Sequence, residues 1–296
     1  FRSQKIDKDC FILQVLKRLF KNKLALAGGI VVLLFLIVGC LAPVIAPHDP
    51  LEVNVSIRLQ GPSQEYWLGT DHLGRCILSR LLYGAQTTLL NSLVVLAGIL
   101  LIGIPLGLIS GFCGGWIDNL IMRFADIVST FPSSLLALAV VSVFGAGLQN
   151  VMIVLVALWW APFARILRSQ VLKIKEKDFV MAAKASGTSK FKIVINHVLL
   201  NSISPIIVYS TLRVAAVIMH IASFSFIGLG TQPPAADWGV MLSDSKQFIS
   251  TAPLMMIWPG LSIMLVVFSL NMFGEGLNEA LMPGGNKKAK QLGDGE

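Results

Sequence analysis

Six long apolar segments separated by polar stretches dominate the chain. They lie near residues 24–46, 87–112, 120–144, 148–167, 205–230 and 256–280. A helix of about 20 residues crosses the roughly 30 Å hydrocarbon core of a bilayer, so each segment is long enough to span it. Because lipid offers the backbone no hydrogen-bond partners, spanning segments must satisfy their own polar groups as helices. The pattern predicts an all-α polytopic membrane protein with six transmembrane helices.

The composition agrees with a membrane protein. Hydrophobic residues make up 55% of the chain and charged residues only 14%, against roughly 25% charged residues in a soluble domain. In a soluble protein the net charge of +8 would suggest a nucleic-acid partner. In a polytopic protein it is explained by the retention of Lys and Arg on the cytoplasmic side of the membrane. We therefore expect the lipid bilayer as partner and no nucleic acid.

The distribution of positive charge predicts the topology. If the N-terminus is cytoplasmic, 19 of the 24 Lys and Arg residues lie on the cytoplasmic side, and Arg213 falls inside the fifth segment. The four on the opposite side are Arg58, Arg75, Arg80 and Lys246. This excess predicts that both termini are cytoplasmic.

This topology divides the chain into three parts. They are a cytoplasmic N-terminal segment (1–23), a transmembrane domain (24–280) and a cytoplasmic tail (281–296). Within the transmembrane domain we expect an exterior segment at 47–86, a cytoplasmic loop at 168–204 and an exterior loop at 231–255.

The cytoplasmic loop contains the stretch DFVMAAKASGTSKFKIVINHVLLN (178–201), which is unlike the apolar segments around it. Gly187 can adopt the positive φ that ends a helix, and Thr188 or Ser189 can cap the next one. The pattern predicts two short helices that meet at an elbow. By pattern alone, an ordinary amphipathic linker is an alternative.

Two further patterns predict helix geometry inside the membrane. Gly103, Gly107 and Gly111 repeat every four residues, which lets a neighbouring helix approach one face closely, most simply within the same subunit. Pro105 and Pro132 are expected to kink their helices.

No catalytic or nucleotide-binding motif stands out. The chain has no G-x-x-x-x-G-K-[ST] phosphate loop. No nucleophilic residue and general base stand at a spacing that would indicate a catalytic site. We therefore expect neither enzymatic activity nor a cofactor bound by this chain.

The elbow stretch resembles the EAA loop of ABC importer permeases, in the variant of the dipeptide/oligopeptide/nickel permease family. The resemblance rests on Met181-Ala182-Ala183, three residues, Gly187, nine residues, and then His197 to Asn201. The family commonly has Glu at the first position and Pro before the final Asn, where this chain has Met181 and Leu200.

Other stretches resemble the same family. They are WLGTDHLGRCILSRLLYGAQTTLL (67–90), RFADIVSTFPSSLLAL (123–138), SFSFIGLGTQPPAADWGVML (223–242) and WPGL (258–261). In the first, Cys76 replaces the family's usual Asp. Together the matches cover nearly the whole chain and indicate the C-type permease subunit.

The resemblance implies a set of partners in a bacterial or archaeal cytoplasmic membrane. They are a homologous second permease, two ATP-binding subunits that carry ATP and Mg²⁺, and an extracytoplasmic solute-binding protein. On this basis the loop between spans four and five docks on an ATPase subunit. Its expected coupling residues are Met181, Ala182, Ala183, Gly187, Lys190, Lys192 and His197.

Ionisable residues inside spans are candidates for function because a charge in lipid is unfavourable. Arg213 and His220 are seven residues apart and share a helical face, so with Met219 they are candidates for the translocation pathway. Arg213 is equally able to pair with a carboxylate of the partner permease. Asp126 is expected to pair with Arg123.

His220 is the one feature that bears on the solute. Imidazole beside the Met219 thioether suits nickel, so His220 is a candidate metal ligand, although a lone His more often bonds a neighbouring helix. Small peptides are therefore placed ahead of nickel or a nickel chelate. A stand-alone channel or secondary transporter is an alternative of another class, and the lack of an inverted repeat of broken helices argues against it.

Overall fold

The computed structural model describes residues 15–281 and contains an elongated bundle of helices. The longer helices are α2 (Lys23–Ile45), α3 (Ile77–Cys113), α4 (Gly115–Thr130), α5 (Ser133–Phe144), α6 (Leu148–Ile174), α9 (Leu200–Phe226) and α11 (Leu254–Leu281). The shorter elements are η1 (Val55–Ile57), α7 (Asp178–Ala185), α8 (Lys190–Ile193), the π-helix η2 (Val194–Leu199), α10 (Trp238–Ser245) and η3 (Lys246–Phe248). The tail expected at 281–296 and the first 14 residues of the expected N-terminal segment lie outside the described residues, apart from Leu281.

The apolar segments form helices long enough to cross a bilayer. Five helices qualify individually, and a sixth crossing results if α4 and α5 are counted as one span. The all-α, polytopic prediction is confirmed. The segment expected at 120–144 is not one continuous helix, however, because α4 and α5 meet at an angle of 81°.

Pro132 explains the break between α4 and α5. Proline lacks the backbone N–H that would continue the helix and disfavours helical backbone in the residue before it. Phe131 accordingly has extended backbone, with φ −80° and ψ 123°. Pro105 does not end its helix, because α3 continues past it to Cys113; the kink expected there stays a prediction.

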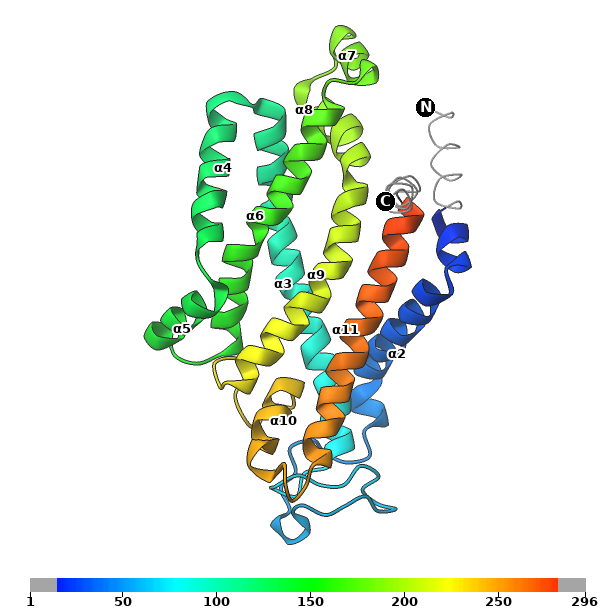
Figure 1. Cartoon of the computed structure of the whole chain (residues 1–296), viewed down its shortest axis with the longest axis vertical. Coiled ribbons are helices and arrows are strands. Elements are labelled where there is room, and N and C mark those ends of the chain that lie inside the picture. The colour runs from blue at the N-terminus through cyan, green and yellow to red at the C-terminus, as the bar shows by residue number, and fades with distance from the viewer. Residues whose placement is uncertain (1–14, 282–296) are drawn as a thin grey trace, which may run out of the picture.

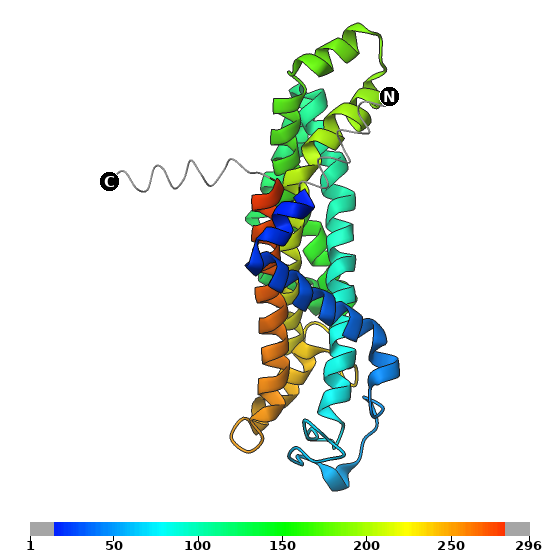
Figure 2. The same cartoon turned by 90° about the vertical axis from the view of Figure 1, so that its right-hand side faces the viewer.

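The two ends of the bundle differ. The helix α7 lies at one end, toward which α2 begins and α11 ends, and α10 lies near the other end with the loops that precede α3 (Figure 1). Turned by 90°, the bundle is narrow and α2 crosses its neighbours obliquely (Figure 2). The described start of α2 and end of α11 thus lie toward the same end, as an even number of crossings requires.

The helices α3 and α6 pack closely through the glycine repeat. A Cβ atom on Gly107 would lie 2.7 Å from the Ala164 backbone oxygen, and one on Gly111 would lie 2.7 Å from the Val171 Cβ. A Cβ atom on Gly103 would lie 2.9 Å from the Phe163 Cβ of α6. Lipid tails are as apolar as leucine, so helices in a membrane associate through such close van der Waals contact. The predicted packing within the subunit is confirmed.

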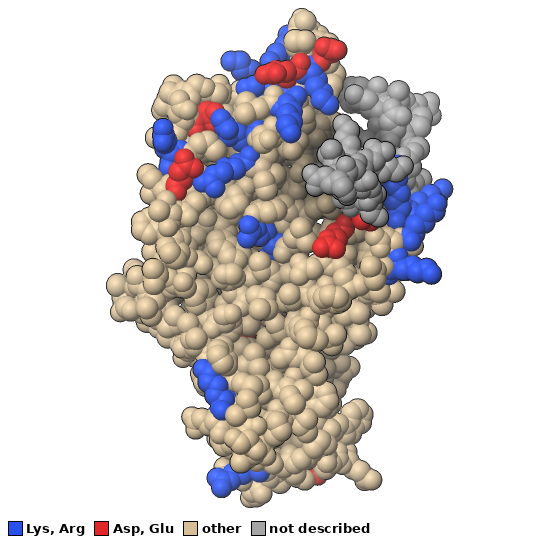
Figure 3. All heavy atoms as spheres, viewed as in Figure 1, with Lys and Arg blue, Asp and Glu red and all other residues tan. Residues whose placement is uncertain are grey.

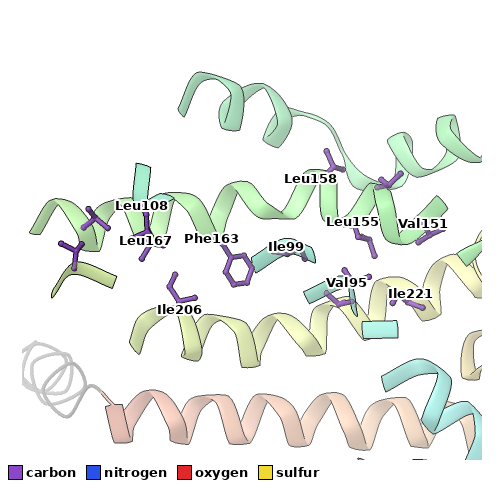
Figure 4. Close-up of a cluster of buried hydrophobic side chains, with 14 of the residues drawn as sticks. Val95, Ile99, Leu108, Val151, Leu155, Leu158, Phe163, Leu167, Ile206 and Ile221 are labelled. Atoms are coloured by element: carbon purple, nitrogen blue, oxygen red, sulfur yellow. The ribbon is translucent and has the colours of Figure 1, made fainter. Parts of the chain in front are cut away.

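Apolar side chains from three helices complete this core (Figure 4). In α3 they include Val95, Ile99 and Leu108; in α6 Val151, Leu155, Leu158, Phe163 and Leu167; and in α9 Ile206 and Ile221. The same cluster reaches Val180 and Ile193, which belong to α7 and α8. The interior of the bundle is therefore continuous with the elbow.

At the opposite end, a buried ion cluster holds the segment before α3 against α10. Arg75 donates from Nε to Asp71 at 2.6 Å and from Nη2 to Asp244 at 3.1 Å. Arg80 Nε lies 3.7 Å from the same Asp71 carboxylate. The two arginines are only 2% and 1% exposed. Their charges are balanced by the two aspartates, as burial requires.

The helix α10 is fixed to α3 as well. Its Trp238 is fully buried, donates from Nε1 to Leu81 O at 3.1 Å and packs directly on Gly84. Asp237 caps the helix by accepting from the Gly239 and Val240 N–H groups. Burial raises the pKa of the Asp237 carboxyl. The loop expected at 231–255 is thus a packed element of the fold.

The structure differs from two expectations that were drawn from the sequence. Asp126 pairs with Arg165 of α6 at 2.9 Å, so the expected pairing with Arg123 is wrong. The helix α3 begins at Ile77, well before the apolar segment expected at 87–112. Its first turns therefore lie within the stretch assigned to the exterior.

Gly107→Ala tests the close packing of α3 on α6. In an open helix interior, alanine is favoured over glycine by about 1 kcal/mol. Here the added methyl group meets Ala164 and Leu167, and overpacking of this kind typically costs about 1–3 kcal/mol. We expect a lower melting temperature of the purified protein. Gly61→Ala, where no atom lies within 4 Å of the added Cβ, is the control. A higher melting temperature for Gly107→Ala would contradict the packing.

Asp71→Asn tests the ion cluster. Removing one partner of a buried ion pair leaves an uncompensated charge and costs about 3–5 kcal/mol. We expect a clear fall in melting temperature for this variant. Glu65→Gln neutralises an exposed carboxylate of the same segment and should leave the melting temperature unchanged. Equal effects of the two substitutions would refute the role of the cluster.

Candidate functional site

The elbow, which we define as residues 178–193, begins with a helix that ends at a glycine. Gly187 has φ +77° and donates to Lys184 O, while the Thr188 N–H donates to Ala183 O, both at 3.1 Å. This pair of bonds is the Schellman motif, in which glycine is favoured because it adopts positive φ without strain. The structure confirms the predicted positive φ at Gly187.

The helix after the elbow is longer than expected. Ser189 stands at the N-cap of α8, without a capping bond from its side chain. From Lys190 the chain stays helical through α8, the π-helix η2 and α9 to Phe226, over 37 residues. No glycine or proline interrupts residues 190–204. The expected second short helix is therefore the first part of a long helix that includes the fifth span.

The elbow has one anchored face and one uncovered face. Val180 and Ile193 are buried in the bundle core, and Ala183 packs partly against it. Met181 is 52% exposed and Phe191 75% exposed. An apolar surface of this kind at the tip of a protein is suited to contact another protein.

The other predicted coupling residues surround this surface. Ala182, Gly187, Lys190 and Lys192 are exposed. His197 is half-buried in η2, and its ring lies 6.5 Å from that of Phe179. Lys and Arg residues gather at this end of the molecule (Figure 3).

A pocket beneath the elbow was not predicted from the sequence. It is lined by Phe112, Cys113, Lys175, Lys184, Thr188, Lys190 and Ile193. Lys175 crosses to α3 and donates from Nζ to Gly111 O at 3.0 Å. This bond joins the C-terminal end of α6 to the end of α3, beside the root of the elbow.

A second cluster, the arginine–aromatic cluster, consists of Trp159, Tyr209, Arg213 and His220. Arg213 donates from Nη2 to the Tyr209 hydroxyl. Its guanidinium carbon lies 4.7 Å from the centre of the Tyr209 ring and 5.4 Å from that of Trp159. The His220 ring meets the same indole edge-on, with ring centres 4.6 Å apart. Arg213 and His220 therefore contact one indole, as their shared helical face predicts.

His220 makes a local hydrogen bond. Its Nδ1 lies 3.0 Å from Ala216 O, so Nδ1–H donates to this carbonyl, and in the neutral form of the ring the lone pair is on Nε2. Within residues 15–281, no group of three or more His, Cys, Asp or Glu side chains is placed to hold a metal ion. The role of His220 as a metal ligand stays a prediction.

Met219 lies apart from this cluster. It is exposed and lines an apolar pocket between α9, α10 and α11. The other lining residues are Ala222, Ser223, Phe226, Ile227, Leu242, Met256, Gly260 and Ile263. The cluster and the pocket thus follow one another along α9.

Sequence reasoning missed Trp159 and Tyr209 as partners of Arg213. The signal for Tyr209 was present, because it precedes Arg213 by four residues, which places both on one helical face. Trp159 comes from another helix, and no spacing in the sequence relates it to α9.

Comparison with known proteins places the chain in a family. Residues 103–284 match the model of the binding-protein-dependent transport system inner membrane component. Residues 11–62 match the N-terminal TM domain of oligopeptide transport permease C. Among solved structures, the inward-facing MetNI methionine ABC transporter has a chain with the same fold, with a TM-score of 0.57 at 17% identity, covering 70% of this chain and 98% of that one.

Curated relatives are similar over most of their length. The dipeptide transport system permease protein DppC of Alkalihalophilus pseudofirmus is 46% identical, over 91% of this chain and 89% of the relative. The nickel transport system permease protein NikC of Escherichia coli K12 is 39% identical, over 80% and 86%. The glutathione transport system permease protein GsiD of Pectobacterium atrosepticum is also 39% identical, over 90% and 89%. The chain therefore belongs to the dipeptide, oligopeptide and nickel permease family of ABC importers, as a C-type, multi-pass permease subunit of the inner membrane.

Proposed function

We propose that this permease moves small peptides by alternating access, driven by ATP hydrolysis in separate subunits. It would pair with a homologous permease, two ATP-binding subunits and an extracytoplasmic solute-binding protein. Family membership supports the general form of this assembly, because such importers depend on a binding protein. Family membership also argues against the alternative function, which is a channel or secondary transporter that works alone.

The elbow supports a coupling role. Its buried residues are continuous with the bundle core, whereas Met181 and Phe191 are uncovered. A force applied to the uncovered face would pass directly into α9, because no loop separates α8 from that helix. The concentration of Lys and Arg at this end supports a cytoplasmic location (Figure 3). We infer that the elbow docks on an ATP-binding subunit.

The arginine–aromatic cluster favours peptides over free nickel ions. Arg213 and His220 contact the same indole, so the guanidinium carbon and the centre of the imidazole ring are about 10 Å apart or less. A unit charge and a divalent cation at that distance repel each other by roughly 3 kcal/mol at an effective dielectric constant of about 20. A carboxylate-bearing peptide would instead be attracted.

Nickel remains the second candidate solute because Nε2 of a neutral His220 ring can bind a metal ion and a nickel permease is among the relatives. The repulsion from Arg213 applies to the bare ion. A nickel chelate with free carboxylates would not meet it, so the nickel alternative is best supported in the chelated form.

Substitution of Gly187 tests the coupling role. A non-glycine L-residue in the left-handed region costs about 1–2 kcal/mol, and β-branched residues fit it worst, whereas asparagine tolerates it. No atom lies within 4 Å of an added Cβ, so backbone conformation alone is altered. We expect Gly187→Val to uncouple ATP hydrolysis from uptake in the assembled importer and Gly187→Asn to transport normally. Normal uptake by Gly187→Val would refute the role.

Uptake by matched cells with and without the gene tests the solute. We expect energy-dependent uptake of a labelled dipeptide to be lost without the gene, and uptake of labelled nickel to be unchanged. Loss of nickel uptake alone would overturn the peptide proposal and make His220 a residue of the nickel pathway.

A further inference from the structure

Within residues 15–281, Arg213 differs from the arginines of neighbouring helices in having no counter-ion. Arg80 of α3 and Arg165 and Arg168 of α6 each lie within ion-pair distance of an aspartate. Among residues 15–281, no carboxylate lies within that distance of Arg213. An ionisable residue in a membrane span without a partner normally faces a water-filled passage or meets a ligand.

The guanidinium of Arg213 is held in place by its own subunit. It stacks near the rings of Tyr209 and Trp159 and donates one hydrogen bond to the Tyr209 hydroxyl. A guanidinium has five N–H donors arranged as a rigid planar fork. The aromatic contacts restrict its orientation and leave most of these donors without a partner in the described part of the chain.

The charge is also accessible. Arg213 is half-buried, and it is the only Lys or Arg of α9. Basic atoms are exposed midway along the face that carries α6 and α9, away from the charged ends of the molecule (Figure 3). A solute passing along this face would therefore meet an oriented, positively charged donor.

We propose that Arg213, oriented by Tyr209 and Trp159, binds the C-terminal carboxylate of a peptide in transit. The fork of a guanidinium matches a carboxylate with two parallel hydrogen bonds. Because the position is half-exposed, water weakens the pairing and the peptide can leave. This inference rests on the proposed function, since it names the group of the solute that the cluster recognises.

The apolar pocket lies on a different side of α9 from Arg213. Met219, which lines this pocket, follows Arg213 by six residues, about 9 Å along the helix and about 120° around it. The carboxylate site therefore consists of Arg213 and its two aromatic neighbours, Tyr209 and Trp159, and the pocket is not part of it.

Binding of alanyl-leucine and of its C-terminal amide tests the proposal. Saturation-transfer NMR on the purified importer, without the solute-binding protein, detects weak binding to the permease itself. We expect the acid to bind more tightly than the amide. Arg213→Gln should weaken binding of the acid about tenfold or more, as loss of a charged hydrogen bond implies, and change binding of the amide less than about twofold. The control Arg58→Gln removes an exposed charge and should change neither.

Several outcomes would overturn the proposal. They are equal binding of acid and amide by the unaltered importer, a parallel loss of both in Arg213→Gln, and separation of the two permease subunits in that variant. The last would assign Arg213 to an ion pair with the partner permease. If the Arg213→Gln chain itself does not fold into the membrane, Tyr209→Phe decides, since it keeps the charge and removes the orienting hydroxyl. It should weaken binding of the acid roughly two- to fivefold, and unchanged binding would refute the proposal.

A negative result in the binding experiment and a negative result in the uptake experiment lead to different conclusions. If the acid binds through Arg213 but cells take up no peptide, the proposed peptide function is wrong and Arg213 serves another carboxylate-bearing solute. If peptides are taken up but acid and amide bind alike, the proposed function stands and the role of Arg213 is wrong.

Discussion

The close contact between α3 and α6 is the constraint on which the rest of the bundle depends. Without side chains on Gly103, Gly107 and Gly111, the two backbones approach closely, and van der Waals contact replaces the hydrophobic effect that is absent in lipid. The position of α6 sets that of Trp159, and thereby the surface on which Arg213 lies. The contact between α3 and α6 ends beside the elbow, where Lys175 Nζ donates a hydrogen bond to Gly111 O. One packing interface therefore supports both candidate sites.

The features predicted from the sequence are those with a local physical cause. Bilayer thickness imposes a minimum length on apolar segments, so the spans were recognisable. The turn at Gly187 was predictable because positive φ favours glycine. The break at Pro132 was expected only as a kink, since its angle of 81° depends on what surrounds the two helices.

Features that depend on distant residues could not be predicted. Asp126 is bound by Arg165, which lies on another helix, whereas the sequence suggested the nearer Arg123. Arg75 pairs with Asp244, which is 169 residues away in the sequence. The contact of Arg213 with Trp159 is of the same kind, because it arises from the packing of α9 on α6. The periodicity of a sequence shows which residues share one face of a helix. Only the tertiary structure shows which residues of another helix that face contacts.

The continuity of helix from Lys190 to Phe226 places the elbow and Arg213 on one helix. At 1.5 Å per residue, Lys190 and Arg213 are separated by roughly 35 Å along this helix. A tilt of about 5° around its elbow end would displace the guanidinium sideways by about 3 Å, roughly the length of a hydrogen bond. The helix would then act as a lever that lengthens or restores a hydrogen bond to the solute each time the elbow tilts.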